Sequence, residues 1–415
     1  MTQHIVAKET PVWQDPRALA LMMAATLMVM ANATISPALA GLEAAFSGQV
    51  NAEILIRFLV PAPSLTVVIF APFMGFLVDR YGRRPLLFLG VGFFVITGSA
   101  GFYLPDLWMI FASRLALGIA VAMIMTAQTA LIGDYYTGTA RTSLTGLQIS
   151  ARNFGGFLFL TLAGWIAISS PRLPFVIYGL ALLYLPFMWS VIKEPAAVTP
   201  KNAPSNNSKT KTSVEGGRPS WRLWTLALAV LQLMTNMIFF LMPTQLPFFL
   251  DSLDYDSAAM TGVALGALSL AGGCAALFYS RIKGFLGYAG IYALGYGFMA
   301  LGFILLSFGA YLPAIIGGSV AIGIGFALVV PNFVGIALQL APSNKRGMAG
   351  GILTTAVFLG QFCSPFLSIP SISVYGFEGT YQGTALLLSI FAIAAIMYAS
   401  GEPPPRQALS SMPPA

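Results

Sequence analysis

The chain has few of the residues that enzymes and metal proteins commonly use. Only 8% of its 415 residues are charged, and it has two cysteines and one histidine. Cys274 and Cys363 lie in apolar runs and His4 lies in the polar N-terminus, so they indicate no disulfide framework, metal site or histidine proton relay. No Walker loop and no nucleophile paired with a base is found. We therefore expect neither an enzyme nor a bound cofactor.

Acidic residues are scarce as well, with 14 against 21 lysines and arginines. Those in or near apolar runs fall at their ends or in loops: Glu43, Glu53, Asp79, Asp106, Asp134, Asp251 and Glu378. A protonatable carboxylate in the middle of an apolar run is therefore not expected. The excess of positive charge is scattered over short loops, which does not favour nucleic-acid binding.

Long apolar runs are what the sequence does have, since 57% of its residues are hydrophobic. A run of roughly 20 residues crosses the hydrocarbon core of a bilayer as a helix. Such runs lie near 18–40, 55–78, 86–104, 108–132, 143–168, 174–192, 223–249, 258–279, 285–308, 312–337, 347–370 and 380–399. The pattern predicts an all-α membrane protein with twelve transmembrane helices in a lipid bilayer.

The distribution of Lys and Arg predicts how these helices are oriented. If the N-terminus is cytoplasmic, almost all basic residues outside the runs lie on the cytoplasmic side, and only Arg57 and Arg172 lie on the other. This is the positive-inside pattern, with both termini in the cytoplasm. We expect a cytoplasmic N-terminus (1–17), a six-helix bundle (18–193), a polar linker (194–220), a second six-helix bundle (221–400) and a cytoplasmic tail (401–415).

The two predicted bundles repeat each other. At one constant spacing Gly118, Ile119 and Ala122 align with Gly323, Ile324 and Ala327, and Arg141, Gly146, Ala151, Gly155 and Phe157 align with Arg346, Gly351, Ala356, Gly360 and Phe362. One ungapped register across two spans and their loop indicates that these helix pairs are copies, so the two six-helix bundles are expected to be pseudo-repeats.

A short basic turn joins the second and third runs. It reads Gly75-Phe-Leu-Val-Asp79-Arg80-Tyr-Gly82-Arg83-Arg84, in which Gly75 permits close helix approach and Gly82 permits a positive φ. This stretch resembles the signature loop of the major facilitator superfamily, Gly-x-x-x-Asp-Arg-x-Gly-Arg-Arg. The resemblance implies two six-helix halves that rock about a central site in a membrane transporter.

The resemblance also implies a cytoplasmic gate. Asp79 would pair with Arg83 one helical turn later and face the start of the eleventh span near Gly347 and Gly350, and Asp134 would complete a cluster of two carboxylates around a guanidinium. The gate residues predicted in this way are Gly75, Asp79, Arg80, Gly82, Arg83, Arg84 and Asp134. A permanent ion-pair network that only fixes the loop is the alternative.

Two arginines lie inside predicted spans, where an arginine is costly unless it faces a cavity or a partner. Arg114 matches the fourth-helix arginine of the superfamily's exporters, with a structural arginine as the alternative; Arg152 either lines the cavity or extends back to the cytoplasmic mouth. Uncharged candidates for the same cavity complete the predicted substrate-binding set: Asn32, Gln128, Gln232, Asn236, Asn332 and Gln361.

We therefore predict a monomeric secondary transporter in the inner membrane of a bacterium, which exports a small neutral or anionic organic solute by alternating access. Two departures from the exporters' pattern argue against antiport of cationic drugs: Ala33 stands where an acidic residue often precedes the first-span proline, and the fifth span lacks their Gly-Pro pair. Whether an ion is coupled to transport stays open. The alternatives are uptake of an organic anion and a membrane sensor that moves no solute.

Overall fold

The structure is a computed structural model, and it describes residues 12–195, 221–342 and 345–401. Within these ranges the secondary structure is helical and contains no strand. Most of the expected N-terminus, linker and tail lies outside the described residues. We call residues 12–195 the N-half and residues 221–401 the C-half.

The N-half is built from eight α-helices and four 3₁₀ helices. They are η1 (Val12–Gln14), α1 (Pro16–Ala33), η2 (Ser36–Ala38), α2 (Leu39–Ala45), α3 (Ala52–Leu59), α4 (Ala62–Tyr81), α5 (Arg83–Ser99), η3 (Ala100–Phe102), α6 (Leu107–Tyr135), α7 (Gly138–Ala167), η4 (Leu173–Leu183) and α8 (Tyr184–Val191). The first two expected spans are each interrupted near prolines, which cannot donate the helical hydrogen bond.

The C-half has fewer but longer helices. They are α9 (Trp221–Phe239), α10 (Leu241–Asp251), α11 (Ser257–Leu306), α12 (Leu312–Leu340) and α13 (Arg346–Gly401). Both α11 and α13 contain one non-helical residue, Gly287 (φ 66°) and Gly376 (φ 69°). A glycine allows this positive φ without a steric penalty, so each long helix turns back on itself there.

The break in α11 corrects the expected boundary. The turn predicted between 279 and 285 is helical, and the chain reverses only at Gly287. The polar residues Arg281 and Lys283 therefore extend the helix instead of ending it. In α13 the break at Gly376 lies inside the expected loop between 370 and 380.

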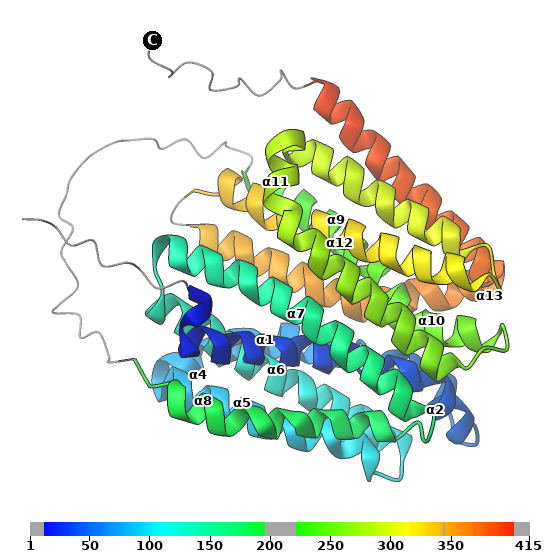
Figure 1. The fold of residues 1–415 in the computed structure, drawn as a ribbon, viewed down its shortest axis with the longest axis horizontal. Coiled ribbons are helices and arrows are strands. Elements are labelled where there is room, and N and C mark those ends of the chain that lie inside the picture. The colour runs from blue at the N-terminus through cyan, green and yellow to red at the C-terminus, as the bar shows by residue number, and fades with distance from the viewer. Residues whose placement is uncertain (1–11, 196–220, 343–344, 402–415) are drawn as a thin grey trace, which may run out of the picture.

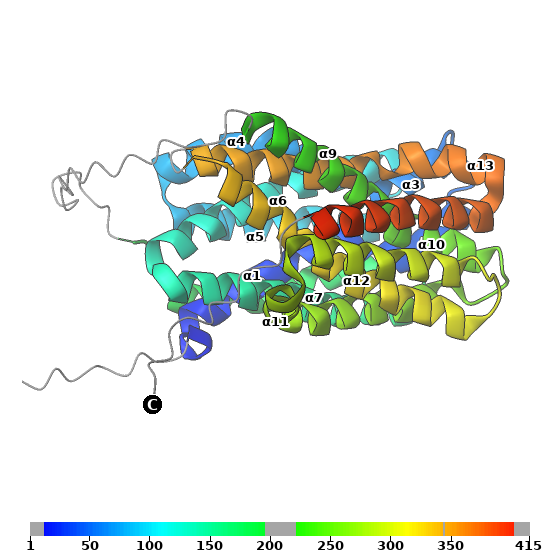
Figure 2. The same cartoon turned by 90° about the horizontal axis from the view of Figure 1, so that it is seen from above.

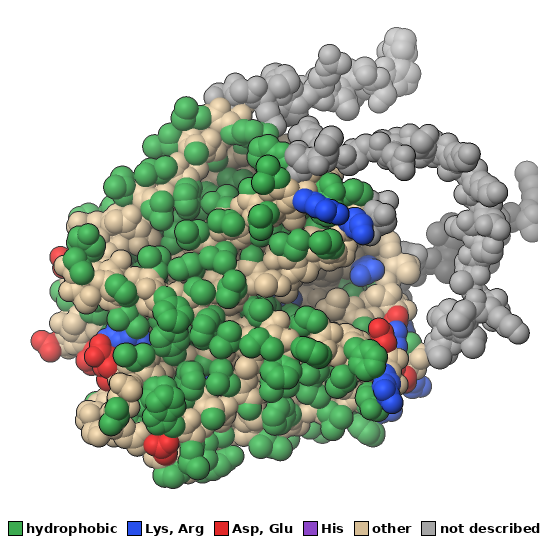
Figure 3. All heavy atoms as spheres, turned by 180° about the vertical axis from the view of Figure 1, so that it is seen from behind, with side chains coloured by type: hydrophobic (Ala, Val, Ile, Leu, Met, Phe, Trp, Pro, Cys, Tyr) green, Lys and Arg blue, Asp and Glu red, His purple; other side chains and the backbone are tan. Residues whose placement is uncertain are grey.

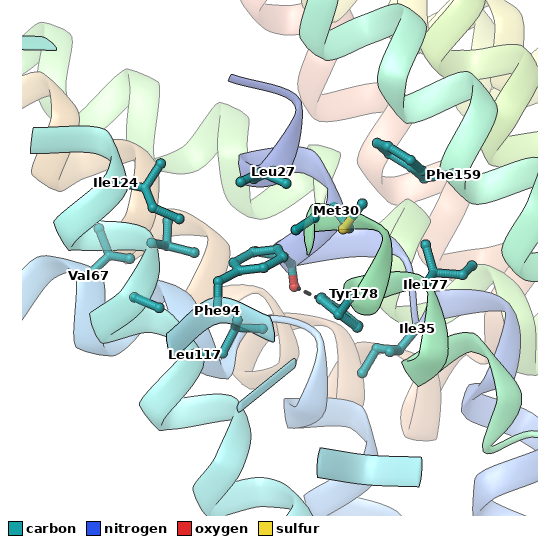
Figure 4. Packing of buried hydrophobic residues seen from close by; sticks show 14 of the residues in the cluster. Leu27, Met30, Ile35, Val67, Phe94, Leu117, Ile124, Phe159, Ile177 and Tyr178 are labelled. Carbon is teal, nitrogen blue, oxygen red and sulfur yellow. Dashed lines mark hydrogen bonds between the residues drawn. The ribbon is translucent and has the colours of Figure 1, made fainter. Parts of the chain in front are cut away.

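Among the described residues, nine helical segments are long and apolar enough to cross a membrane. The long helices, α7 included, run along one common axis, with α7 beside α11 on one side of the bundle and α4 beside α13 on the other (Figures 1 and 2). Each half has its own hydrophobic core: one cluster is drawn almost entirely from the N-half and the other from the C-half. Figure 4 shows the first core around Phe94 and Tyr178, whose rings lie 5.5 Å apart. Large apolar side chains also cover the outer surface (Figure 3), as expected for a protein surrounded by lipid.

Candidate functional site

The two halves approach each other most closely along α7 and α11. Gly164 and Gly262 face each other so tightly that a Cβ built on either would lie 2.7 Å from the other's Cα. At a second contact between α7 and α11, a Cβ on Gly156 would lie 3.0 Å from the Ser269 hydroxyl. Small residues thus let the two backbones touch, and any larger side chain at Gly164 or Gly262 would push the halves apart.

The turn between α4 and α5 is fixed by two carboxylates, and we call this end of the bundle the Arg83 end. Arg83 Nε forms an ion pair with Asp134 at 2.9 Å, where both side chains are about one-third exposed (31% and 32%). Glu194 accepts hydrogen bonds from the backbone nitrogens of Arg83 (2.8 Å) and Arg84 (2.7 Å). Glu194 therefore caps the N-terminus of α5, where unpaired N–H groups favour an anion.

Two of the expected gate features differ from the prediction, and a third is confirmed. Asp79 is exposed and has no hydrogen bond or ion pair with any described residue, so the expected Asp79–Arg83 pair is wrong for this state. The reason is geometric, because Arg83 turns toward α6 and Asp134. A Cβ at Gly75 would have nothing within 4 Å, so no helix approaches closely there. The expected positive φ at Gly82 is confirmed at 97°.

The two other arginines of the turn have aromatic partners. Arg84 lies 4.3 Å from the ring of Trp189 and donates to its backbone oxygen at 3.1 Å. Arg80 lies 5.6 Å from the ring of its neighbour Tyr81. Both aromatic partners belong to the N-half, so these contacts stabilise the N-half and do not join it to the C-half.

A second group of polar contacts continues this network. The Tyr136 hydroxyl donates to Asp15 at 2.6 Å, and Arg17 forms an ion pair with Asp15 at 3.2 Å. Burial alone would raise the pKa of Asp15, but the hydrogen bonds from Tyr136 and Arg17 outweigh it and hold this pKa below its usual value. Burial of Tyr136 itself and its hydrogen bond to Asp15 raise the pKa of the Tyr136 hydroxyl.

No contact of the described residues joins Asp79 to the start of α13. A Cβ at Gly347 or at Gly350 would have nothing within 4 Å, although these glycines were the expected partners. The space-filling view shows a hollow between the two halves at this end, with Lys and Arg side chains on its rim (Figure 3). The halves are therefore separated at the Arg83 end.

In the middle of the bundle the halves are joined by one amide. The Gln361 side-chain oxygen accepts hydrogen bonds from Asn32 at 3.2 Å and from Ser64 at 2.7 Å. The structure thus brings together two of the predicted substrate-binding residues, Asn32 on α1 and Gln361 on α13. The Asn32 side-chain oxygen is buried and has no partner among the described residues, which leaves it free to accept a hydrogen bond.

Arg114 lies in α6 with no exposed surface. Its Nε donates to the Leu59 carbonyl at 3.1 Å, Nη1 donates to the Tyr178 hydroxyl at 2.8 Å, and Nη2 donates to the Ala31 carbonyl. The Leu59 carbonyl lacks a helical donor because the residue four positions later is Pro63. The Ala31 carbonyl belongs to the last turn of α1, where helical donors run out. All three nitrogens are used by the protein, so the geometry supports the structural alternative for Arg114.

Arg152 has the opposite surroundings. Its Nε is buried without a hydrogen-bond partner, and it forms no ion pair with any described residue. The next residue, Asn153, packs against α11, where a Cβ at Gly273 would lie 3.0 Å from the Asn153 Cβ. Arg152 is therefore a cation without a carboxylate partner among the described residues, next to the interface between the halves.

The remaining predicted residues divide by their partners. Gln128 donates to the Leu21 carbonyl at 2.6 Å, and Asn332 is held between the Tyr279 hydroxyl (2.7 Å) and the Tyr288 carbonyl (3.0 Å). These two side chains stabilise helix contacts in this structure. Asn236 donates to the Gln232 carbonyl at 2.8 Å within α9, and the Gln232 side-chain oxygen is buried without a partner.

Sequence reasoning missed Glu194 and Tyr178. Glu194 is the first residue of the predicted linker, and its only signal was an acidic residue directly after a span on the basic side of the membrane. Tyr178 had no signal of its own, because its role depends on Arg114 from another helix.

The comparisons with known proteins agree with this architecture. The sequence profile of the Major Facilitator Superfamily matches residues 21–362 and 257–414. Quinolone resistance protein NorA of Staphylococcus aureus is 24% identical over 349 residues, which is 82% of this chain and 87% of NorA. Multidrug resistance protein 1 of Bacillus subtilis is 29% identical over 157 residues, which is 37% of this chain and 40% of that protein.

Solved transporter structures have the same fold. A D-xylose–proton symporter superposes with a TM-score of 0.71 at 17% identity, over 91% of this chain and 96% of the symporter. The inward-open xylose transporter XylE of E. coli gives a TM-score of 0.67, also at 17% identity, over 91% of this chain and 95% of XylE. These matches confirm the resemblance found in the signature loop: the chain belongs to the Major Facilitator Superfamily and is a multi-pass membrane transporter.

Proposed function

We propose that this transporter exports a small anionic or neutral organic solute across the inner membrane by alternating access. Two relatives are named for drug resistance, which supports export. The substrate class rests on the residues of this chain, because no relative is similar enough to transfer it.

The proposal includes twelve spans in two halves of six, with both termini in the cytoplasm and the chain acting as a monomer. Dividing α11 at Gly287 and α13 at Gly376, and adding α7, brings the nine apolar segments to twelve. The Arg83 end is then cytoplasmic, because it carries most of the basic residues. The hollow at that end corresponds to a cavity open toward the cytoplasm.

One observation carries the substrate class: the Nε of Arg152 in α7 is buried without a hydrogen-bond partner, and the side chain forms no ion pair with any described residue. An arginine inside a membrane is expensive unless another group compensates its charge. No carboxylate of the sequence lies in the middle of a span, so the protein itself supplies no counter-charge there. An anionic group of the substrate would supply it, and a cation would be repelled.

The other predicted site residues have supporting roles in this proposal. Asn32, Gln361 and Gln232 line the route between the halves, since Asn32 and Gln361 meet across them and two of these side chains have an oxygen without a partner. Asp79 acts as a gate residue that finds its partner only when the Arg83 end closes. Gln128, Asn332 and Arg114 hold the helices in place.

A binding screen tests the substrate class. Purified transporter is melted in the presence of matched pairs of probes, such as benzoate with benzamide and citrate with its trimethyl ester. A ligand that binds the folded state raises the apparent melting temperature, and we expect this rise for carboxylates only. The rise should vanish in Arg152→Gln. If quaternary ammonium ions stabilise the protein and carboxylates do not, the proposed class is wrong.

Direction is tested separately in vesicles. Inside-out vesicles should accumulate the carboxylate that binds best, and right-side-out vesicles should not. Accumulation in right-side-out vesicles alone would assign the protein to uptake.

A further inference from the structure

The end of the bundle opposite Arg83 is closed, and one arginine joins the two halves there. We call it the Arg57 end. Arg57 lies in α3 of the N-half, and its side chain is only 13% exposed. Its Nη1 donates to the Gln245 side-chain oxygen of α10 in the C-half at 2.8 Å. Its guanidinium lies 4.4 Å from the ring of Phe248, also in α10.

The contact extends from Arg57 into the core of the C-half. Gln245 has no exposed surface, and its amide nitrogen donates to the Ser368 hydroxyl of α13 at 2.8 Å. Arg57, Gln245 and Ser368 therefore form one chain of hydrogen bonds from α3 through α10 to α13. Beside it, the ring of Phe58 packs against Phe362 and Phe366 of α13 at 5.7 and 5.0 Å.

The charges around Arg57 allow its contact with the C-half to break at low energetic cost. Arg57 Nη2 also forms an ion pair with Glu53 at 3.1 Å, one turn earlier in the same helix. Glu53 moves together with Arg57, so the guanidinium keeps its counter-charge when the halves separate. Its partner across the interface is a neutral amide, so no buried charge is left unpaired in the C-half.

We propose that Arg57 is a latch that holds the Arg57 end closed, and that it releases Gln245 and Phe248 when the transporter opens on that side. The inference rests on alternating access, and it does not depend on the substrate. Loss of the latch removes one hydrogen bond from a charged donor and one cation–aromatic contact. The ratio of outward-open to inward-open molecules should then rise on the order of tenfold or more.

Distances between two spin labels measure this ratio directly. Val50 (78% exposed) and Ser252 lie on opposite halves near the Arg57 end, and both can be replaced by cysteine for labelling. The two native cysteines are first replaced by serine. In lipid nanodiscs we expect the labelled protein that retains Arg57 to give mainly a short distance between positions 50 and 252. The Arg57→Ala variant should add a population at longer distance.

A second pair of labels distinguishes rocking of the halves from local loosening. Ser143 at the start of α7 and Met348 at the start of α13 are exposed on opposite halves at the Arg83 end. In Arg57→Ala this pair should move closer while the first pair moves apart. If neither distance distribution changes, or only the first one broadens, Arg57 is not a latch.

Two further variants serve as controls. Gln245→Leu keeps the Arg57–Glu53 pair and removes both the acceptor for Arg57 and the hydrogen bond to Ser368, so it should reproduce most of the shift. Arg172 matches Arg57 closely, since it donates to the Leu104 carbonyl at 2.7 Å and lies 5.0 Å from the ring of Phe46, but both partners belong to the N-half. Arg172→Ala should leave both distances unchanged, and an equal shift in this variant would overturn the proposal. Because no transport is measured, failure here leaves the proposed substrate class untouched.

Discussion

Replacement of Arg114 should reduce stability first and ligand binding only as a consequence. Arg114→Met keeps most of the side-chain volume and removes three hydrogen bonds, to the carbonyls of Leu59 and Ala31 and to the hydroxyl of Tyr178. Hydrogen bonds between membrane helices contribute roughly 0.6–2 kcal/mol each, so the free energy of unfolding should fall by about 2–6 kcal/mol. None of these three acceptors can reach water, which places the value in the upper part of that range.

The assay is the apparent melting temperature of detergent-purified protein, followed by size-exclusion chromatography. Arg114→Lys should fall between the wild type and Arg114→Met, because an ammonium cannot reach three acceptors in the directions that a guanidinium fork provides. Arg152→Met is the matched control, since it also removes an arginine from a span but breaks no hydrogen bond of Nε. Its stability should equal or exceed that of the wild type. If Arg114→Met melts at the wild-type temperature, the structural role is refuted.

Three further predictions concern Arg152 and the Arg83 end. Arg152→Gln should abolish the thermal stabilisation by carboxylates without lowering the melting temperature of the ligand-free protein, and retained stabilisation would show that another group binds the anion. Asp79→Asn should leave stability unchanged because Asp79 has no partner in this state, yet it should slow transport in vesicles; full activity would exclude Asp79 from the gate. Asp15→Asn should destabilise the protein at neutral pH, because hydrogen bonds from Tyr136 and Arg17 lower the pKa of this carboxyl. The contribution of a carboxyl with a lowered pKa is complete above its unfolded value and disappears as the pH falls below about 4, so the difference in melting temperature should shrink there.

The helices and the signature turn could be predicted from the sequence, because each depends on local residues. Apolar length predicts a membrane helix, and a glycine in a short polar turn predicts a positive φ, as found at Gly82. The sequence misplaces the boundary in α11, because the polar residues Arg281 and Lys283 end the apolar run without ending the helix. A helix continues into water until a residue such as Gly287 permits the turn.

Partners of long side chains could be predicted only in part. The sequence predicts Arg83 near both Asp79 and Asp134. In the structure it forms its ion pair with Asp134, which lies 51 positions away in the sequence. Glu194, more than 100 positions away in the sequence, accepts hydrogen bonds from the backbone nitrogens of Arg83 and Arg84. Such choices depend on which conformational state is populated, and the sequence describes all states of a transporter at once.

The two arginines in the spans show which information was missing. Arg114 and Arg152 are the same residue type in similar apolar surroundings, yet one is saturated by the protein and the other has a free donor. The difference lies in the neighbouring helices, where Pro63 leaves the Leu59 carbonyl without its helical donor. A buried carbonyl of this kind must find a donor, and a guanidinium from the next span can satisfy several at once. An arginine that donates to the free carbonyls of a proline-broken span is thus expected to be structural, whereas Arg152, whose Nε has no such acceptor among the described residues, keeps a free donor.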